Sequence, residues 1–228
     1  MFFQKQQNSN QVAFSIIVFI GFIGILLTTM GCASNIKSAK KSIKQPLIGK
    51  VTKVQNSAML NHKNNLALND VIALGDFIQT SQDARVELLL KDGTIITLGQ
   101  NTDLLLNRYI FKPSISKGEL FFEIKQGDFA IKTGKLSKQK KKQFSIRTTM
   151  ALIGVRGTTF WGGSLDGVTF DVALLEGQSV LISNQGGEVR INDIGFGTTL
   201  KNFQTAPTKP KKWPQHKIVR ALDTVSFK

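Results

Sequence analysis

The stretch that decides the fold runs from residue 144 to residue 161 and reads Phe144-Ser-Ile-Arg-Thr-Thr-Met-Ala-Leu-Ile-Gly-Val-Arg-Gly-Thr-Thr-Phe-Trp161. Apolar and polar side chains alternate at its start, which is the period-2 pattern of a β-strand. Two glycines, Gly154 and Gly157, then enclose a Val-Arg pair, and glycine inside a strand marks a bulge, a bend or a close backbone approach. A second β-like run follows at once. We therefore predict two strand segments that meet at a tight corner, where one arginine is held.

Outward from this corner, the clearest local signal is a hairpin. Two β-like runs, 85–91 and 94–98, are joined by Asp92-Gly93. This pair suits a type I′ turn, because both central residues of such a turn need positive φ. The pattern recurs around Gly127-Asp128 and Glu176-Gly177, and residues 184–187 turn the chain into a further run.

Short β-like runs and turn residues make up almost everything after Lys44, and only Ile218–Leu222 shows signs of helical periodicity. Strands at short spacing with turns between them indicate an all-β sandwich, barrel or short solenoid.

The corner motif and the upstream turn resemble the hallmark of the FecR domain family. The matching residues are Gly154, Val155, Arg156, Gly157 and Thr158 at the corner, with Asp92 and Gly93 upstream. The similarity spans roughly residues 49–177, and it departs from the family at Thr148-Thr149, where Thr-Pro is usual. The resemblance implies an extracytoplasmic all-β module with short winding strands, in a sandwich or short solenoid.

Arg156 has two possible roles at the corner. A guanidinium can hold carbonyls or a carboxylate in a fixed fork geometry, so we expect a structural clamp, with Asp171 and Glu176 as candidate partners. The alternative is that Arg156 contacts a partner protein.

The chain is strongly basic, with a formal net charge of +15, and long stretches lack any acidic residue. Such a surface should attract lipid head groups, acidic glycans or other polyanions. The lysine-rich segment 134–143 is expected to be a loop between strands, either mobile and solvated or able to bind. Its candidate anion contacts are Lys138, Lys140, Lys141 and Lys142.

The N-terminal region has the features of an export signal. A polar start with Lys5 precedes the apolar run 12–27, and small residues around Gly31-Cys32 follow. The Gly-Cys pair resembles a bacterial lipobox, whose cysteine is acylated, so Cys32 is the candidate lipidation site. A retained membrane anchor and an ordinary cleaved signal are the alternatives. All three place the following domain outside the cytoplasm, associated with the membrane in the first two cases.

These patterns predict four parts of the chain. Residues 1–33 form the signal peptide, lipobox or membrane anchor, and residues 34–45 form a basic tether. Residues 46–203 form the FecR-like β domain. Residues 204–228 form a basic tail that contains proline, and we expect Trp213 in this tail to dock on the domain.

The residues for enzyme chemistry are missing from the sequence. One cysteine and two histidines, His62 and His216, do not make a zinc cluster, and Ser, His and carboxylate residues fall in no nucleophile pattern. We therefore expect a non-enzymatic protein that uses no cofactor.

Two functions follow from the sequence. The first is a binding or scaffold module, tethered to the membrane, that contacts another envelope protein or an anionic glycan or lipid; export argues against nucleic acid. The alternative is a signalling component related to FecR-type regulation of an extracytoplasmic-function sigma factor. Founding family members carry a cytoplasmic domain before the membrane segment, whereas about eleven residues precede it here. Regulation would therefore pass through a separate partner.

Overall fold

The computed structural model describes residues 45–228, so the predictions for the export segment, for Cys32 and for residues 34–44 of the tether lie outside it. Sixteen strands, two short 3₁₀ helices and one α-helix follow one another along the described chain. Their bounds are β1 (Leu47–Gln55), β2 (Ala58–Leu60), β3 (Asn64–Asn65), β4 (Val71–Ala73), β5 (Phe77–Thr80), β6 (Arg85–Leu90), β7 (Ile95–Leu98), β8 (Asp103–Lys112), η1 (Pro113–Ile115), β9 (Lys117–Gln126), β10 (Phe129–Lys132), η2 (Lys135–Lys138), β11 (Lys141–Thr148), β12 (Leu152–Gly163), β13 (Phe170–Asn184), β14 (Gly187–Ile191), β15 (Phe196–Leu200), β16 (Lys211–Lys212) and α1 (Gln215–Asp223).

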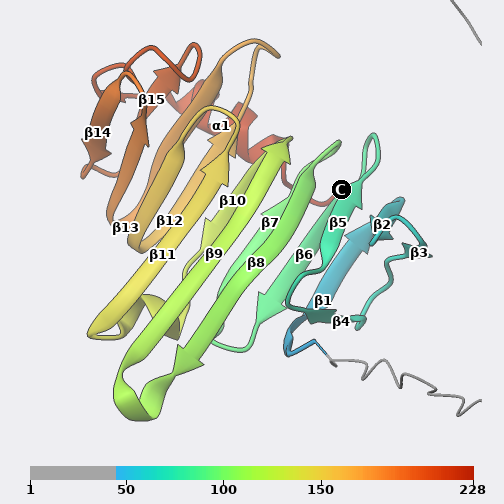
Figure 1. The fold of residues 1–228 in the computed structure, drawn as a ribbon. Coiled ribbons are helices and arrows are strands. Elements are labelled where there is room, and N and C mark those ends of the chain that lie inside the picture. Colours follow the sequence, from blue (N-terminus) through green and yellow to red (C-terminus); the bar gives the residue numbers. More distant parts are fainter. Residues whose placement is uncertain (1–44) are drawn as a thin grey trace, which may run out of the picture. The chain divides into compact units, whose positions relative to one another are not determined.

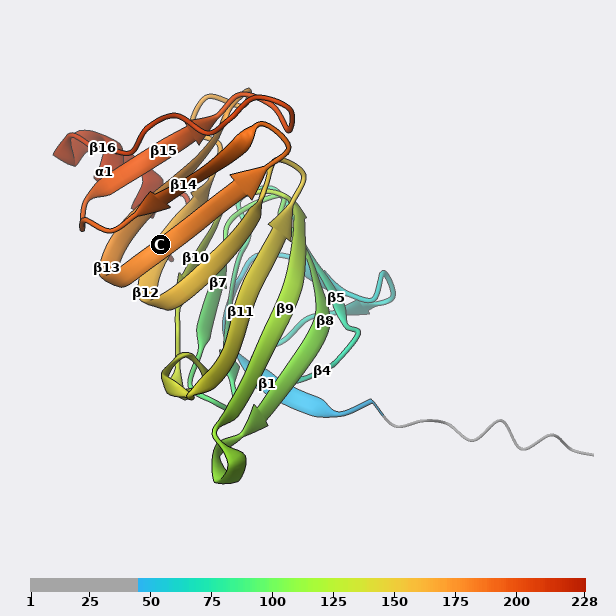
Figure 2. The same ribbon diagram turned by 60° about the vertical axis from the view of Figure 1, so that its left-hand side comes forward.

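All strands belong to one hydrogen-bonded sheet that curls into a half-barrel (Figures 1 and 2). We call the strands β3-β2-β5-β8-β9-β11 the first leaf and the strands β10-β7-β6-β1-β4 the second leaf. Strand β12 joins them, because residues 152–154 pair with β11 and residues 159–162 pair with β10. Strand β13 pairs with β12 along both halves and carries β14 and β15. The all-β prediction is confirmed.

The two leaves enclose one hydrophobic core. Phe122 on β9, Phe129 on β10 and Phe160 on β12 are fully buried in it, and the rings of Phe129 and Phe160 meet edge to face with centroids 6.0 Å apart. Alternation explains how the strands supply this core: on β11, Ile146 and Thr148 are buried while Arg147 between them is exposed. The period-2 pattern read from the sequence is therefore the inside–outside pattern of the sheet.

The predicted hairpin at Asp92-Gly93 exists, but its turn is of another type. Strands β6 and β7 pair as expected, and only Gly93 of the two turn residues has positive φ, at 85°. The Gly93 N–H donates to the Leu90 carbonyl at 2.9 Å, and the Leu90 N–H donates to the Thr94 carbonyl at 2.9 Å. This is a three-residue loop that ends in a left-handed glycine, a common alternative to the two-residue type I′ turn.

Two of the recurrences of this pattern are not hairpins. Strands β9 and β10, on either side of Gly127-Asp128, lie in different leaves, so this turn carries the chain from one leaf to the other. Glu176-Gly177 lies inside the continuous strand β13, where it forms a bend. The hairpin at residues 184–187 is present, as β13 pairs with β14.

The C-terminal segment packs on the sheet. Strand β16 pairs with β15, and α1 covers the region expected to be helical. Trp213 lies between them, 3% exposed, and its ring meets that of Trp161 edge to face at 6.1 Å. The expected docking of Trp213 is confirmed. Within residues 45–228, no helix has both the length and the apolar character that crossing a bilayer requires.

Candidate functional site

The motif corner is a bend shared by β12 and β13. Gly157 has φ 60° and faces Gly177 of β13, which has φ 93°. A Cβ atom on Gly177 would collide with the backbone oxygen of Gly157, so the two strands approach more closely here than any side chain permits. The pairing register shifts just beyond the bend, between Thr159 and Phe160. The bend is what lets β12 pass from the first leaf to the second.

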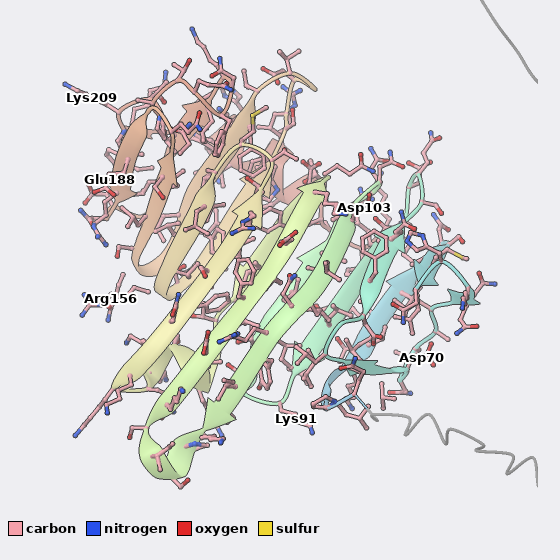
Figure 3. The ribbon with its side chains drawn as sticks, viewed as in Figure 1. Asp70, Lys91, Asp103, Arg156, Glu188 and Lys209 are labelled. Carbon is pink, nitrogen blue, oxygen red and sulfur yellow. The ribbon has the colours of Figure 1, made fainter. Side chains whose placement is uncertain are left out.

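Arg156 lies on the outside of this bend. Its side chain is exposed and extends away from the sheet in Figure 3, and no ion pair or hydrogen bond within residues 45–228 involves its guanidinium. Asp171 pairs instead with Lys217 at 3.1 Å and accepts a hydrogen bond from the Thr199 hydroxyl. Glu176 accepts one from the Thr159 hydroxyl at 3.0 Å. The predicted pairing of Arg156 with Asp171 or Glu176 is therefore wrong.

Asp92 has a function that its turn position did not reveal. Its buried carboxylate accepts hydrogen bonds from the Thr94 hydroxyl at 2.7 Å and from the Leu136 N–H at 3.1 Å. Tyr109 donates to the same carboxylate at 3.2 Å, and burial, together with the Asp92 charge, raises the pKa of Tyr109 far above its ordinary value. Asp92 therefore fastens η2 to the β6–β7 turn.

The lysine-rich segment is consequently a packed structure for most of its length. Leu136 of η2 is fully buried and Ser137 nearly so, and β11 begins already at Lys141. The expectation of a loop that spans residues 134–143 is corrected, because Leu136 belongs to the core and the Lys135 N–H donates to the Asp92 carbonyl at 2.8 Å. The lysines of this segment stand on a fixed backbone.

These lysines do not all face the same place. Lys138 and Lys142 line a cavity of about 470 Å³ beside the bend, together with Lys132 at the end of β10. Lys141 lines a neighbouring hollow with Lys142, whereas Lys140 lines neither. The structure therefore separates the four lysines that the sequence grouped, and it adds Lys132 from another strand.

The cavity lies where η2, β11, β12 and β13 meet. Its wall includes Gly157 and Thr158 of the family motif, and Gly177 from the facing strand. Thr158 is 4% exposed, and its hydroxyl has no hydrogen-bond partner among residues 45–228. Its N–H, in contrast, is bonded to the Thr133 hydroxyl at 2.9 Å. The adjacency of the motif and the lysines could not be read from the sequence, because β10 and β13 reach the cavity through sheet pairing alone.

The cavity wall offers mainly lysine cations and hydroxyl groups. No group of three or more His, Cys, Asp or Glu side chains within residues 45–228 is placed to hold a metal ion. His62 lies in an exposed turn with its ring 4.6 Å from that of Phe77, and His216 lies on α1. The chemistry available beside the bend is electrostatic and hydrogen-bonded recognition.

Comparisons with known proteins identify a matching family and solved structures of similar fold. Residues 76–179 match the family model described as FecR protein. Two crystal structures, each described as a candidate anti-sigma factor from Parabacteroides distasonis, are similar in fold. The first has 16% identity, a TM-score of 0.51 and coverage of 63% of this chain and 62% of its own. The second has 17% identity, a TM-score of 0.49 and the same coverage.

The matched part is thus less than two thirds of the length of those structures. No curated protein matches the chain. The family match begins at the Gly75-Asp76 turn and ends on β13 just beyond the bend, so it contains both the Asp92 anchor and the β12 corner. The resemblance to the FecR family is therefore confirmed over residues 76–179, which the family model matches.

Proposed function

We propose that this protein is a signalling component of the FecR type, which acts through a separate protein partner in the bacterial envelope and influences an extracytoplasmic-function sigma factor. The observation that carries the proposal is the FecR domain at residues 76–179, with its motif intact at the β12 bend. The fold it shares with a candidate anti-sigma factor is consistent with this role. The protein transmits a state by contact and does no chemistry of its own.

The exposed face of the bend is the part of the domain we assign to this contact. Arg156 projects from it unpaired by any described residue, and Leu152 at the start of β12 is 43% exposed. Arginine is enriched at protein interfaces and among the residues that carry most of the binding energy. A rigid strand that joins both leaves can present these groups in a fixed orientation.

Transcription tests the proposal. We expect deletion of the gene to change a small set of transcripts that share one type of promoter, and complementation with the wild-type chain to restore them. Complementation with Arg156→Ala should fail although the variant accumulates normally, and Arg190→Ala, a change on β14 away from the bend, should succeed. Unchanged transcription with an altered envelope would instead favour the scaffold function.

The location is proposed on the sequence of the N-terminal region. We propose that the domain is exported and held at the membrane, with Cys32 as the acylated residue because the Gly31-Cys32 pair lies four residues after the apolar run 12–27. Labelling with a fatty-acid analogue should mark the wild type but not Cys32→Ala. If wild type and Cys32→Ala were labelled equally, or if neither were labelled, Cys32 would not be the acylated residue. The apolar segment would then be the candidate anchor.

A further inference from the structure

We propose that the cavity beside the β12 bend is a binding site for a small anion that carries a phosphoryl group. The inference does not rest on the signalling role, because it follows from the walls of the cavity alone. The volume of about 470 Å³ lies within the roughly 300–1,000 Å³ typical of small-molecule sites.

Charge is the first argument. Lys132, Lys138 and Lys142 reach the cavity from β10, η2 and β11. None of the ion pairs formed within residues 45–228 includes any of these three lysines. Glu176 is the one acidic residue in the wall. The excess of positive charge favours an anion with more than one negative charge, and lysine ammonium groups bind phosphate as point charges.

Hydrogen bonding is the second argument. Thr133 and Thr158 both line the cavity, and the Thr158 hydroxyl is buried without a partner in the described chain. The Thr133 hydroxyl accepts a hydrogen bond from the Thr158 N–H at 2.9 Å and keeps its own proton to donate, so an oxyanion beside the bend gives it an acceptor and pairs with the lysines.

Rigidity is the third argument. The backbone that carries Lys138 is fixed by the buried Leu136 side chain and by the bond from the Leu136 N–H to the Asp92 carboxylate. Strand β11 fixes Lys142 by parallel pairing with β9, where Lys142 faces Gly118. Only side-chain freedom is lost on binding, which favours a preformed site over a solvated charged surface.

The test separates this site from general attraction to a basic protein. The full chain, in an uncharged detergent at about 0.15 M salt, is titrated with pyrophosphate by calorimetry, because at this salt long-range attraction is screened beyond about 8 Å. The site variant is Lys138→Gln with Lys142→Gln. The matched control is Lys135→Gln with Lys140→Gln, which removes the same charge from the same segment but not from the cavity wall.

We expect saturable binding by the wild type, weakened about tenfold in the site variant and about twofold or less in the control. Glu176→Gln should tighten binding, since it removes the opposing carboxylate and keeps an acceptor for the Thr159 hydroxyl, whereas Glu188→Gln on β14 should not. Absence of saturable binding, or equal losses in the site variant and its control, overturns the proposal.

A second arm identifies the source of the phosphoryl group. The same variants are mixed with vesicles of phosphatidylglycerol in phosphatidylcholine and with vesicles of phosphatidylcholine alone. If the site variant loses anionic-vesicle binding more than the control does, the phosphoryl group belongs to a lipid. Pyrophosphate binding with equal vesicle binding in the two variants indicates a soluble phosphate ester. Both results support the site.

Discussion

At the scale of single residues, the family motif and the stability of the domain are separable. Arg156 is exposed and makes no ion pair within residues 45–228. We expect both Arg156→Ala and Arg156→Lys to leave the free energy of unfolding within about 0.5 kcal/mol of wild type, because surface substitutions away from special features have effects of this size. Urea unfolding followed by circular dichroism measures it.

Asp92→Ala provides the contrast in the same assay. This change leaves the Leu136 N–H and the Tyr109 hydroxyl without their buried acceptor, so a loss of about 3 kcal/mol is expected. If Arg156→Ala lowered the urea midpoint as much as Asp92→Ala does, Arg156 would have the structural clamp role that the sequence suggested.

Asp128 gives the domain a dependence on pH. Burial raises the pKa of this carboxyl above its ordinary value of 3.8, although the Ser164 N–H donates to it at 2.8 Å. A carboxyl whose pKa is higher in the folded state stabilises the fold at low pH, and this contribution is lost as pH rises through the folded pKa. Asp128→Asn keeps an acceptor without a charge, so its stability relative to wild type should increase from pH 3 to pH 7. A constant difference across that range would contradict the assignment, and thermal unfolding at each pH measures it.

At the scale of elements, two glycines separate the two reasons for which a position can need glycine: a left-handed backbone conformation and a close contact with a neighbouring strand. Gly167 and Gly177 both have positive φ, at 73° and 93°, but a Cβ atom on Gly167 would meet nothing within 4 Å. Gly167→Ala should therefore cost only the left-handed conformation, about 1–2 kcal/mol. Gly177→Ala should cost several kcal/mol more, because it pushes β13 away from Gly157. Equal unfolding free energies for the two variants would show that β12 and β13 are not in tight contact at the bend.

Three glycines show how far sequence can predict this fold. Gly93, Gly127 and Gly177 have nearly the same φ, at 85°, 89° and 93°. The first ends a hairpin turn, the second lies where the chain crosses between leaves, and the third bends a continuous strand. Local sequence determines the backbone conformation, so strands and turns were predictable. Which strand pairs with which depends on packing across the whole sheet. A glycine with this φ is compatible with a hairpin turn, a crossing between leaves or a bend within a strand.

In the candidate site, too, local features were predictable from the sequence and strand pairing was not. The run of lysines was evident in the sequence, and the motif beside it was recognisable. Their convergence required β10 and β13 to pair on either side of β12, which no turn signal specifies. The anchoring role of Asp92 was hidden for a similar reason, since its partner Leu136 lies 44 residues further along the chain.

At the scale of the whole molecule, the C-terminal segment is an integral part of the domain. Trp213 packs against Trp161, whose ring N–H donates to the Thr224 hydroxyl at 3.0 Å, and the Lys228 N–H reaches the Gln55 side chain at 2.8 Å. We expect Trp213→Ala to destabilise the domain by about 3–5 kcal/mol, as large-to-small changes of buried aromatic residues do. Phe203→Ala, at a residue 39% exposed, is the control and should cost much less. Thermal unfolding of the two variants compares them, and equal effects would mean that the segment only rests on the surface.

The position of β12 between the leaves has a consequence for biosynthesis. A nascent chain that ends before Leu152 lacks β12, which pairs with the free edges of both β10 and β11, so both leaves present unpaired backbone groups at once. Such edges are templates for wrong pairing with other chains. We therefore expect the nascent chain to be most prone to aggregation before β12 has been made, and chaperones that hold unfolded chains to matter most in that interval.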